Sequence, residues 1–228
     1  MEQLPLYIPV VFIATSLLTW FFLYKSSRLS QRFMIIIAVW LALQAVVSLL
    51  NFYKDTQAMP PRLGLAIGIP VLSIIGLFIT QRGRTIIDSW DVKWLTWLHV
   101  VRVPVELTLY WLFLYKQIPQ LMTFEGVNYD ILSGITAPVM VLLCLGTPRI
   151  RRMPLLIWNF ICLALLFNIV IRAILAAPTP FQQLAFDQPN VAVLYFPYIW
   201  LPAFIVPAVL LSHLIAIRRL IRKNGQRL

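Results

Sequence analysis

A series of apolar blocks, each close to twenty residues long, constrains the fold of this chain more than any other feature. An α-helix needs about 20 apolar residues to cross the hydrocarbon core of a bilayer. Hydrophobic residues make up 61% of the chain, more than a soluble domain usually contains, so the blocks predict membrane spans. We expect seven spans, at residues 6–24, 33–52, 63–80, 94–115, 129–146, 154–176 and 191–217.

These blocks and the short loops between them account for the whole of residues 1–228. The predicted fold is therefore an all-α polytopic bundle of seven transmembrane helices that forms one domain. No stretch is left over that could fold as a separate water-soluble unit, because each loop is too short to bury a core of its own.

The basic residues indicate how the bundle is oriented. Fourteen of the 19 Lys and Arg residues fall at alternate boundaries between the predicted spans. They are Lys25, Arg28, Arg32, Arg82, Arg84, Lys93, Arg149, Arg151, Arg152, Arg218, Arg219, Arg222, Lys223 and Arg227. Cytoplasmic loops collect Lys and Arg, so we expect the N-terminus outside and the C-terminus in the cytoplasm. The net charge of +11 then signals topology and contact with anionic lipid headgroups, and no nucleic acid is expected as a partner.

Residues 84–97 differ from the spans around them. Trp90, Trp94 and Trp97 are spaced by four and three residues, so they would share one face of a helix. Trp rings favour the headgroup level of a membrane. We therefore expect a short cytoplasmic helix that lies in the interface and leads into the fourth span.

The fourth span contains the stretch HVVRVPVEL, in which ionisable residues interrupt a run of Val and Leu. His99, Arg102, Glu106 and Tyr110 are spaced by three, four and four residues and so share one helical face. A charged side chain at the bilayer centre costs about 2.5–3.5 kcal/mol on insertion scales, so this face should point into the bundle. We expect Arg102 and Glu106 to pair with each other or each with a partner residue on another helix.

The sixth span offers polar partners for this face. Asn168 and Arg172 are four residues apart, and Arg172 would lie at a depth from which it could reach Glu106. We predict a polar cavity, open to the outside, with Arg102 and Glu106 at its floor and Asn168 and Arg172 in its wall. Glu125, Asn128 and Asp130 would form its external mouth, with Asn128 capping the fifth helix.

Two functions fit such a cavity. Two arginines against one buried glutamate would favour a small anionic or zwitterionic ligand, as in a carrier or ligand-binding permease. Alternatively, Glu106 would be the proton-carrying group of a coupled transporter. The seventh span would be the moving element, because Pro197, Pro202 and Pro207 each remove a backbone donor and bend the helix.

His99 and His213 are the only histidines, and both are expected near the cytoplasmic ends of their spans. They open a different alternative, an intramembrane haem or metal redox protein or enzyme in which they hold the iron axially. Their spacing also fits two histidines that satisfy neighbouring carbonyl groups. No other cofactor is predicted, and no hydrolase, metalloprotease or P-loop motif occurs in the sequence.

The segments TFEGVNYDILSGITAP and WLPAFIVPAVLLSHL resemble those of bacterial multi-pass membrane proteins without an assigned function. The resemblance implies a seven-helix protein of the bacterial inner membrane, and it transfers no activity to any residue. A third hypothesis therefore stays open, a membrane sensor or assembly subunit in which the buried polar residues are purely structural.

Overall fold

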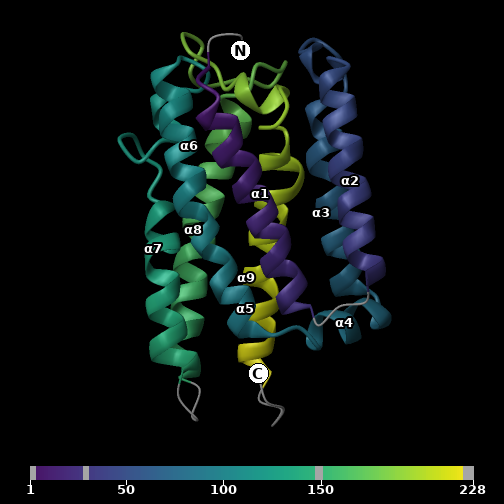
Figure 1. Cartoon of the computed structure of the whole chain (residues 1–228), viewed down its shortest axis with the longest axis vertical. Helices are drawn as coiled ribbons and strands as arrows, with labels where there is room; N and C mark the ends of the chain where they lie inside the picture. The colour runs from purple at the N-terminus through teal and green to yellow at the C-terminus, as the bar shows by residue number, and fades with distance from the viewer. Residues whose placement is uncertain (1–3, 28–30, 147–150, 223–228) are drawn as a thin grey trace.

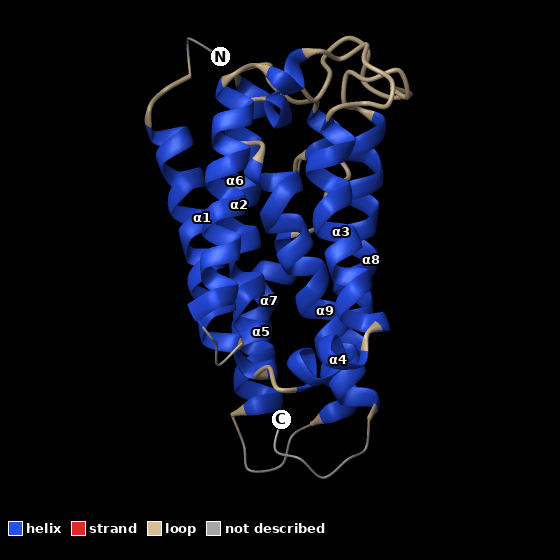
Figure 2. Cartoon of the chain, turned by 90° about the vertical axis from the view of Figure 1, so that its right-hand side faces the viewer, coloured by secondary structure: helices blue, strands red, loops and turns tan. Residues whose placement is uncertain are grey.

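The computed structural model describes residues 4–27, 31–146 and 151–222, and within them it contains helices and loops but no strand (Figure 2). This confirms the predicted all-α class. The long helices run side by side, and the chain starts and finishes at opposite ends of the molecule (Figure 1). Four of the basic residues used to predict the orientation, Arg28, Arg149, Lys223 and Arg227, lie outside the described residues.

The α-helices are α1 (Tyr7–Ser26), α2 (Gln31–Leu49), α3 (Leu63–Ile79), α4 (Gln81–Asp88), α5 (Val92–Leu98), α6 (Arg102–Leu114), α7 (Ile131–Met140), α8 (Arg152–Leu175) and α9 (Val206–Ile221). Four single 3₁₀ turns are η1 (Phe52–Lys54), η2 (His99–Val101), η3 (Gln120–Met122) and η5 (Ala192–Leu194), and two π-helical segments are η4 (Val141–Leu145) and η6 (Leu201–Ile205).

Five helical segments in the described part of the chain are long and apolar enough to cross a membrane. They are α1, α2, the continuous run Val92–Leu114, α8 and the run Leu201–Ile221. A sixth is added if α3 and α4, which meet at an angle of 93°, are counted as one broken span. The segment Ile131–Leu145 is apolar but shorter. The described part of the chain thus contains helices long and apolar enough to span a membrane at five or six of the seven predicted positions.

The bend between α3 and α4 turns the chain across the end of the bundle (Figure 2). At the bend, the Thr80 hydroxyl accepts the backbone N–H of Gly83 at 3.1 Å and so caps α4. At the far end of α4, Asp88 binds Arg218 of α9 and Arg222, the residue that follows α9, each with a closest N···O distance of 2.7 Å. These contacts fix α4 beneath the end of α9.

The predicted single helix over residues 84–97 is broken into α4 and α5. Trp90 lies in the break and is fully buried, with its ring 5.7 Å from that of Phe33 in an edge-to-face arrangement. Only Trp94 and Trp97 follow one another on α5, and both are half-buried. The shared tryptophan face was therefore wrong, because the chain changes direction between Asp88 and Val92.

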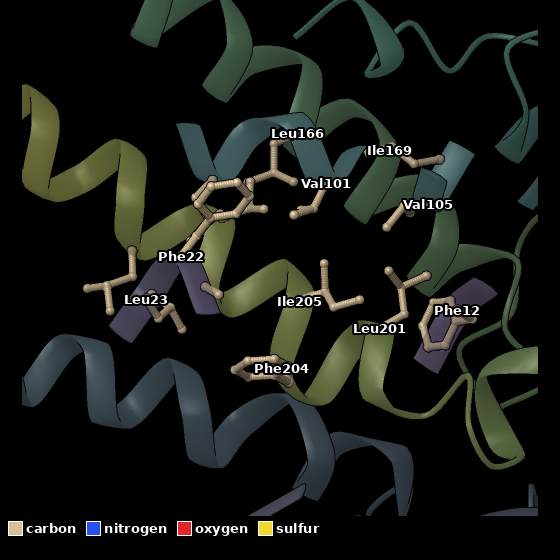
Figure 3. Close-up of a cluster of buried hydrophobic side chains, with 14 of the residues drawn as sticks. Phe12, Phe22, Leu23, Val101, Val105, Leu166, Ile169, Leu201, Phe204 and Ile205 are labelled. Carbon is tan, nitrogen blue, oxygen red and sulfur yellow. The ribbon is translucent and has the colours of Figure 1, made fainter. Parts of the chain in front are cut away.

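The main core is formed by residues from α1, α6, α8 and η6. Phe12, Val105, Ile169 and Leu201 converge from these four elements, as Figure 3 shows. Helices α8 and α9 pack together, and α1 packs against both α5 and α6. This packing holds α6, which carries the ionisable stripe, between other helices.

Helices α2 and α3 stand to one side of this core (Figure 1). Indole hydrogen bonds attach α2 to the last span: Trp40 donates to Ala203 O at 2.9 Å, and Trp200 donates to Leu41 O at 3.0 Å. Pro207, four residues after Ala203, has no N–H to offer this carbonyl group. The Trp40 indole therefore donates to the Ala203 carbonyl group in place of the N–H that Pro207 lacks. Membrane helices tolerate proline when a neighbouring group supplies the missing donor in this way.

Candidate functional site

The stretch HVVRVPVEL forms η2 and the first turns of α6. Pro104 is the third residue of α6, a position whose backbone N–H has no partner inside a helix, so proline fits there at little cost. Because α6 begins at Arg102, His99 lies before the helix in η2 and Glu106 lies one turn after the start of α6. All three side chains are buried, with only 1–2% of their surface exposed.

Arg102 is the centre of a continuous chain of hydrogen bonds, which we call the Arg102 network (Arg102, Asp130, His213 and Asn159). One terminal nitrogen of Arg102 donates to Asp130 Oδ1 at 2.8 Å, and the other lies 2.9 Å from His213 Nε2. His213 Nδ1 lies 2.9 Å from Asn159 Oδ1. Asn159 in turn donates to Leu155 O at 2.8 Å.

This geometry fixes the proton on the His213 ring. A guanidinium group can only donate, so His213 Nε2 is the acceptor and carries no proton. The amide nitrogen of Asn159 is donating to Leu155 O, so its oxygen faces His213 Nδ1 and accepts from it. His213 is therefore a neutral imidazole with its proton on Nδ1, and the Arg102 network contains one positive and one negative charge.

Gly134 and the turn held by the Asn128 side chain allow Asp130 to lie close to Arg102. The Asn128 side-chain oxygen accepts the backbone N–H of Asp130 at 3.1 Å, which holds the turn before α7. One turn into α7, a Cβ atom on Gly134 would lie 2.8 Å from the Val103 side chain and 3.0 Å from its backbone nitrogen. Gly134 thus permits the close approach of α7 and α6 that the ion pair requires.

His99 lies beside the Arg102 network. Its ring stacks on that of His213, with ring centroids 4.0 Å apart and an angle of 23° between the planes. Trp158 packs edge-on against the other side of the pair, 5.4 Å from the His99 centroid. Within the described part of the chain, His99 Nδ1 has no hydrogen-bond partner.

Glu106 has different surroundings from Asp130. The side-chain nitrogen of Asn128 lies 2.7 Å from each of its carboxyl oxygens, and the same nitrogen also reaches Met122 O at 2.9 Å. None of the ion pairs between described residues involves Glu106. A buried carboxyl group is thus held by a neutral amide and lacks a cation.

A cavity of about 90 Å³ lies next to this carboxyl group, and we call it the Glu106 cavity. Its polar side chains are Glu106, Asp130 and Asn190, and the rest of its wall is apolar and comes from α3, α6, η3, α8, η5, η6 and α9. Asn190 donates to Ala173 O at 3.3 Å, whereas its Oδ1 is buried without a hydrogen-bond partner among the described residues. A volume of this size has room for several water molecules or a small ligand.

The structure differs from the predicted cavity in its basic groups. Arg102 pairs with Asp130 instead of Glu106. Arg172 donates to Asn168 Oδ1 at 3.0 Å, and Asn168 donates to Val127 O at 2.9 Å, so these two residues brace the loop before α7. Neither arginine nor Asn168 lines the cavity, since the ion pair and the loop contacts hold them elsewhere.

The remaining predicted site residues divide between the interior and the surface. Asn128 and Asp130, expected at an external mouth, are buried parts of the site. The residue at the N-cap position of α7 is Asp130, two residues after the predicted cap Asn128. Glu125 is exposed, and the hydroxyl of Tyr110 interacts with it outside the cavity.

The three prolines lie in an irregular segment, where the sequence predicted one bent helix. Pro197 precedes the helix in a turn, Pro202 lies in the π-helical segment η6, and Pro207 is in the first turn of α9. Of the three, Pro202 lines the Glu106 cavity. One of the three predicted hinge residues is thus next to the candidate site.

Asn190 is the functional candidate that sequence reasoning missed. It is a single Asn at the end of a polar loop, next to Pro189, and no spacing relates it to the spans. The loop folds back, and its backbone N–H donates to Ala176 O at 2.8 Å, which brings the side chain over the cavity. Only the three-dimensional path of the loop places this residue.

The histidine pair gives no geometric support to a haem site. Axial ligands point at an iron from opposite faces of a porphyrin, whereas the rings of His99 and His213 stack face to face at 4.0 Å. Both ring nitrogens of His213 are already engaged by Arg102 and Asn159. Among the described residues, no group of three or more His, Cys, Asp or Glu side chains could hold a metal ion.

Comparison with known protein families gives one match. A family model described as a domain of unknown function (DUF8737) matches residues 60–221, which include every residue of the Arg102 network and the Glu106 cavity. No curated protein and no solved structure matches the chain. The predicted resemblance to a family without an assigned function is confirmed, and the comparison transfers no activity.

Proposed function

We propose that this chain, which belongs to the DUF8737 family, is an integral membrane carrier in which Glu106 takes up and releases a proton. The observation that carries the proposal is the position of Glu106. Its carboxyl group is 98% buried, has no cation as a partner among the described residues, and borders a cavity. An isolated carboxylate is costly to bury, so a proton or another cation must accompany it there.

In this proposal the bundle has seven membrane segments. Helix α3, with α4 folded across its end and outside the membrane, and the shorter Ile131–Leu145 segment join the five longer ones. The N-terminus lies outside and the C-terminus in the cytoplasm of a bacterial inner membrane. The exposed residues Arg82, Arg84 and Lys93 support this orientation, because they cluster at one end where they would meet anionic lipid headgroups.

The moving element would be the irregular segment that leads into α9. Its π-helical part, η6, borders the Glu106 cavity through Leu201 and Pro202. Short π-helical segments are frequent at functional sites. A shift of η6 would change the access of Glu106 to the two sides of the membrane, while the Arg102 network would stay fixed.

The lining of the cavity alters the expected ligand. The sequence favoured an anionic or zwitterionic ligand, on the assumption that Arg102 and Arg172 face the cavity. Neither residue does so, and the polar groups in the wall are two carboxyl groups and an amide. This lining supports a positively charged partner for Glu106.

Proton flux into liposomes tests the proposal. Purified protein is reconstituted into liposomes that enclose a pH-sensitive dye, and a potassium gradient with valinomycin drives protons inward. We expect acidification that depends on the protein and is lost in Glu106→Gln. Glu125→Gln serves as the matched control, because Glu125 is exposed and outside the cavity, so its flux should equal that of the wild type.

Two results would contradict the proposal. One is a wild-type flux no greater than that of empty liposomes. The other is an unchanged flux in Glu106→Gln, provided that the variant elutes from size-exclusion chromatography as the wild type does.

A further inference from the structure

We infer that the Glu106 cavity binds a small primary alkylammonium ion, held by the carboxyl groups of Glu106 and Asp130 and by the side-chain oxygen of Asn190. This inference rests on the proposed function, since the ligand would share Glu106 with the transported proton. It names the chemical class of a second cation that can occupy the site in place of that proton.

The first argument is the excess of hydrogen-bond acceptors over donors among the polar side chains that face the cavity. Carboxylates only accept hydrogen bonds, and one N–H group of the Asn190 amide already donates to Ala173 O at 3.3 Å. Asn190 is 99% buried, yet its Oδ1 has no partner in the described part of the chain. A buried acceptor of this kind costs about 1–3 kcal/mol if it stays unpaired, so the site calls for a donor.

The second argument is charge. The positive charge of Arg102 offsets that of Asp130 across a 2.8 Å ion pair, which leaves the ionised form of Glu106 uncompensated. A ligand with one positive charge would neutralise it. A neutral alcohol would satisfy Asn190 without meeting this requirement, and an anion would add to the imbalance.

The third argument distinguishes among cations. A primary ammonium group has three N–H donors, which matches three acceptor side chains. A quaternary ammonium ion has no donor and is usually bound by aromatic cages. No aromatic ring is among the described residues that line the Glu106 cavity. Calcium and magnesium ions need about six oxygen ligands, more than these three side chains supply.

The fourth argument is the apolar remainder of the wall. Leu109, Leu166 and Ile169 surround the three acceptors and would bury a short alkyl chain. The rim includes Ile174, which is 43% exposed, and the half-buried Val170 and Pro202. A cavity of about 90 Å³ with such a rim suits an amine with only a few carbon atoms, whose neutral form dissolves in the membrane.

Isothermal titration calorimetry of the purified protein in detergent micelles tests the inference. The probe is propylammonium chloride, and tetramethylammonium chloride is the control of equal charge without N–H donors. We expect saturable heat with propylammonium, and binding of tetramethylammonium at least tenfold weaker. Absence of propylammonium binding, or equal affinity for the two cations, would overturn the inference.

Two variants of one residue sharpen the test. Asn190→Leu removes the unpaired acceptor and should weaken propylammonium binding about tenfold, the effect of losing one hydrogen bond to a charged group. Asn190→Asp keeps an acceptor in place and should bind at least as tightly as the wild type. Equal affinity in Asn190→Leu and the wild type would remove Asn190 from the site.

The outcome is separable from that of the proposed function. Proton flux without propylammonium binding would refute the alkylammonium site and leave Glu106 as a proton carrier. Propylammonium binding without proton flux would establish the site and refute the transport of protons.

Discussion

Two buried carboxyl groups, Asp130 and Glu106, line one cavity and have opposite surroundings. Asp130 is paired with Arg102, and Arg102 also contacts His213, which in turn contacts Asn159. The charges of the Arg102 network are thus balanced, and of its side-chain polar atoms Arg102 Nε is the one buried without a hydrogen-bond partner among the described residues. Glu106 has only the neutral amide of Asn128. A network whose charges are balanced has little to offer a charged ligand, whereas a carboxyl group without a cation requires one.

The comparison divides roles that the sequence could not separate. The Arg102 network fits the hypothesis of a structural polar core, because it connects α6, α7, α8 and α9 through buried polar contacts. The Glu106 cavity fits a binding or proton-carrying role. One molecule thus contains both, on neighbouring turns of a single helix.

The largest effect is expected from Arg102→Met. The substitution leaves Asp130 as a buried charge without a partner and removes the donor to His213 Nε2. Breaking a buried pair in this way costs about 3–5 kcal/mol. Unfolding in mixed micelles of increasing denaturing detergent measures the loss.

A second variant tests whether that loss comes from the stranded charge. In the double variant Arg102→Met with Asp130→Asn, both charges are gone, and much of the stability should return. If Arg102→Met unfolds at the same detergent fraction as the wild type, the Arg102 network does not stabilise the fold and its structural role is refuted.

A smaller loss is expected from Gly134→Ala, which tests how α7 is held against α6. The added Cβ would lie 2.8 Å from the Val103 side chain and 3.0 Å from its backbone nitrogen, so the helices must separate. Overpacking of this kind costs about 1–3 kcal/mol. Gly68→Ala is the matched control, because nothing lies within 4 Å of its added Cβ and alanine favours helix. Equal stability of the two variants would show that the close approach does not matter.

A still smaller effect on stability is expected from Glu106→Gln, below about 1 kcal/mol, because no cation is stranded and Asn128 can donate to the new amide oxygen. The matched change at the other carboxyl group, Asp130→Asn, leaves Arg102 without its counterion and should cost clearly more. Thermal unfolding of both variants in detergent compares them directly. Equal losses would contradict the division between the two carboxyl groups.

The sequence was sufficient to predict the helical class and the burial of three of the four residues in the stripe of the fourth span. Apolar blocks of membrane-spanning length and a three-and-four spacing are local properties, and His99, Arg102 and Glu106 are buried. Tyr110, the fourth residue of the stripe, is half-buried and interacts with Glu125 outside the cavity. The lengths of the apolar runs did not predict the turn of the chain between Asp88 and Val92. They also did not predict the irregular segment before α9. Both features depend on packing against other helices.

Partner choice was beyond the sequence for a related reason. Arg102 and Glu106 are four residues apart on one face, which favours their pairing. Instead, Asp130 at the start of α7 forms the ion pair with the Arg102 guanidinium group. The position of Asp130 depends on Gly134 and on the turn held by Asn128. Neither residue signals its partner through spacing along the chain.

The smallest effect is expected from an ion cluster at the end of the bundle, where Asp88 binds Arg218 and Arg222. The hydrogen bond from Arg218 lowers the pKa of Asp88 below its ordinary value, against the opposing effect of burial, and the nearby positive charges add to the lowering. A carboxyl group with a lowered pKa in the folded state stabilises the protein above its ordinary pKa and loses that contribution as the pH falls. The wild type should therefore exceed Asp88→Asn in stability at pH 7 by no more than about 1 kcal/mol, since the pair is partly exposed. This difference should vanish on acidification below about pH 4, as unfolding in micelles at a series of pH values would reveal.

A stability difference between the wild type and Asp88→Asn that persists in acid would mean that Asp88 acts through its shape and hydrogen bonds. The conclusion that buried ion pairs stabilise this protein more than exposed ones would then rest on the Arg102 network alone.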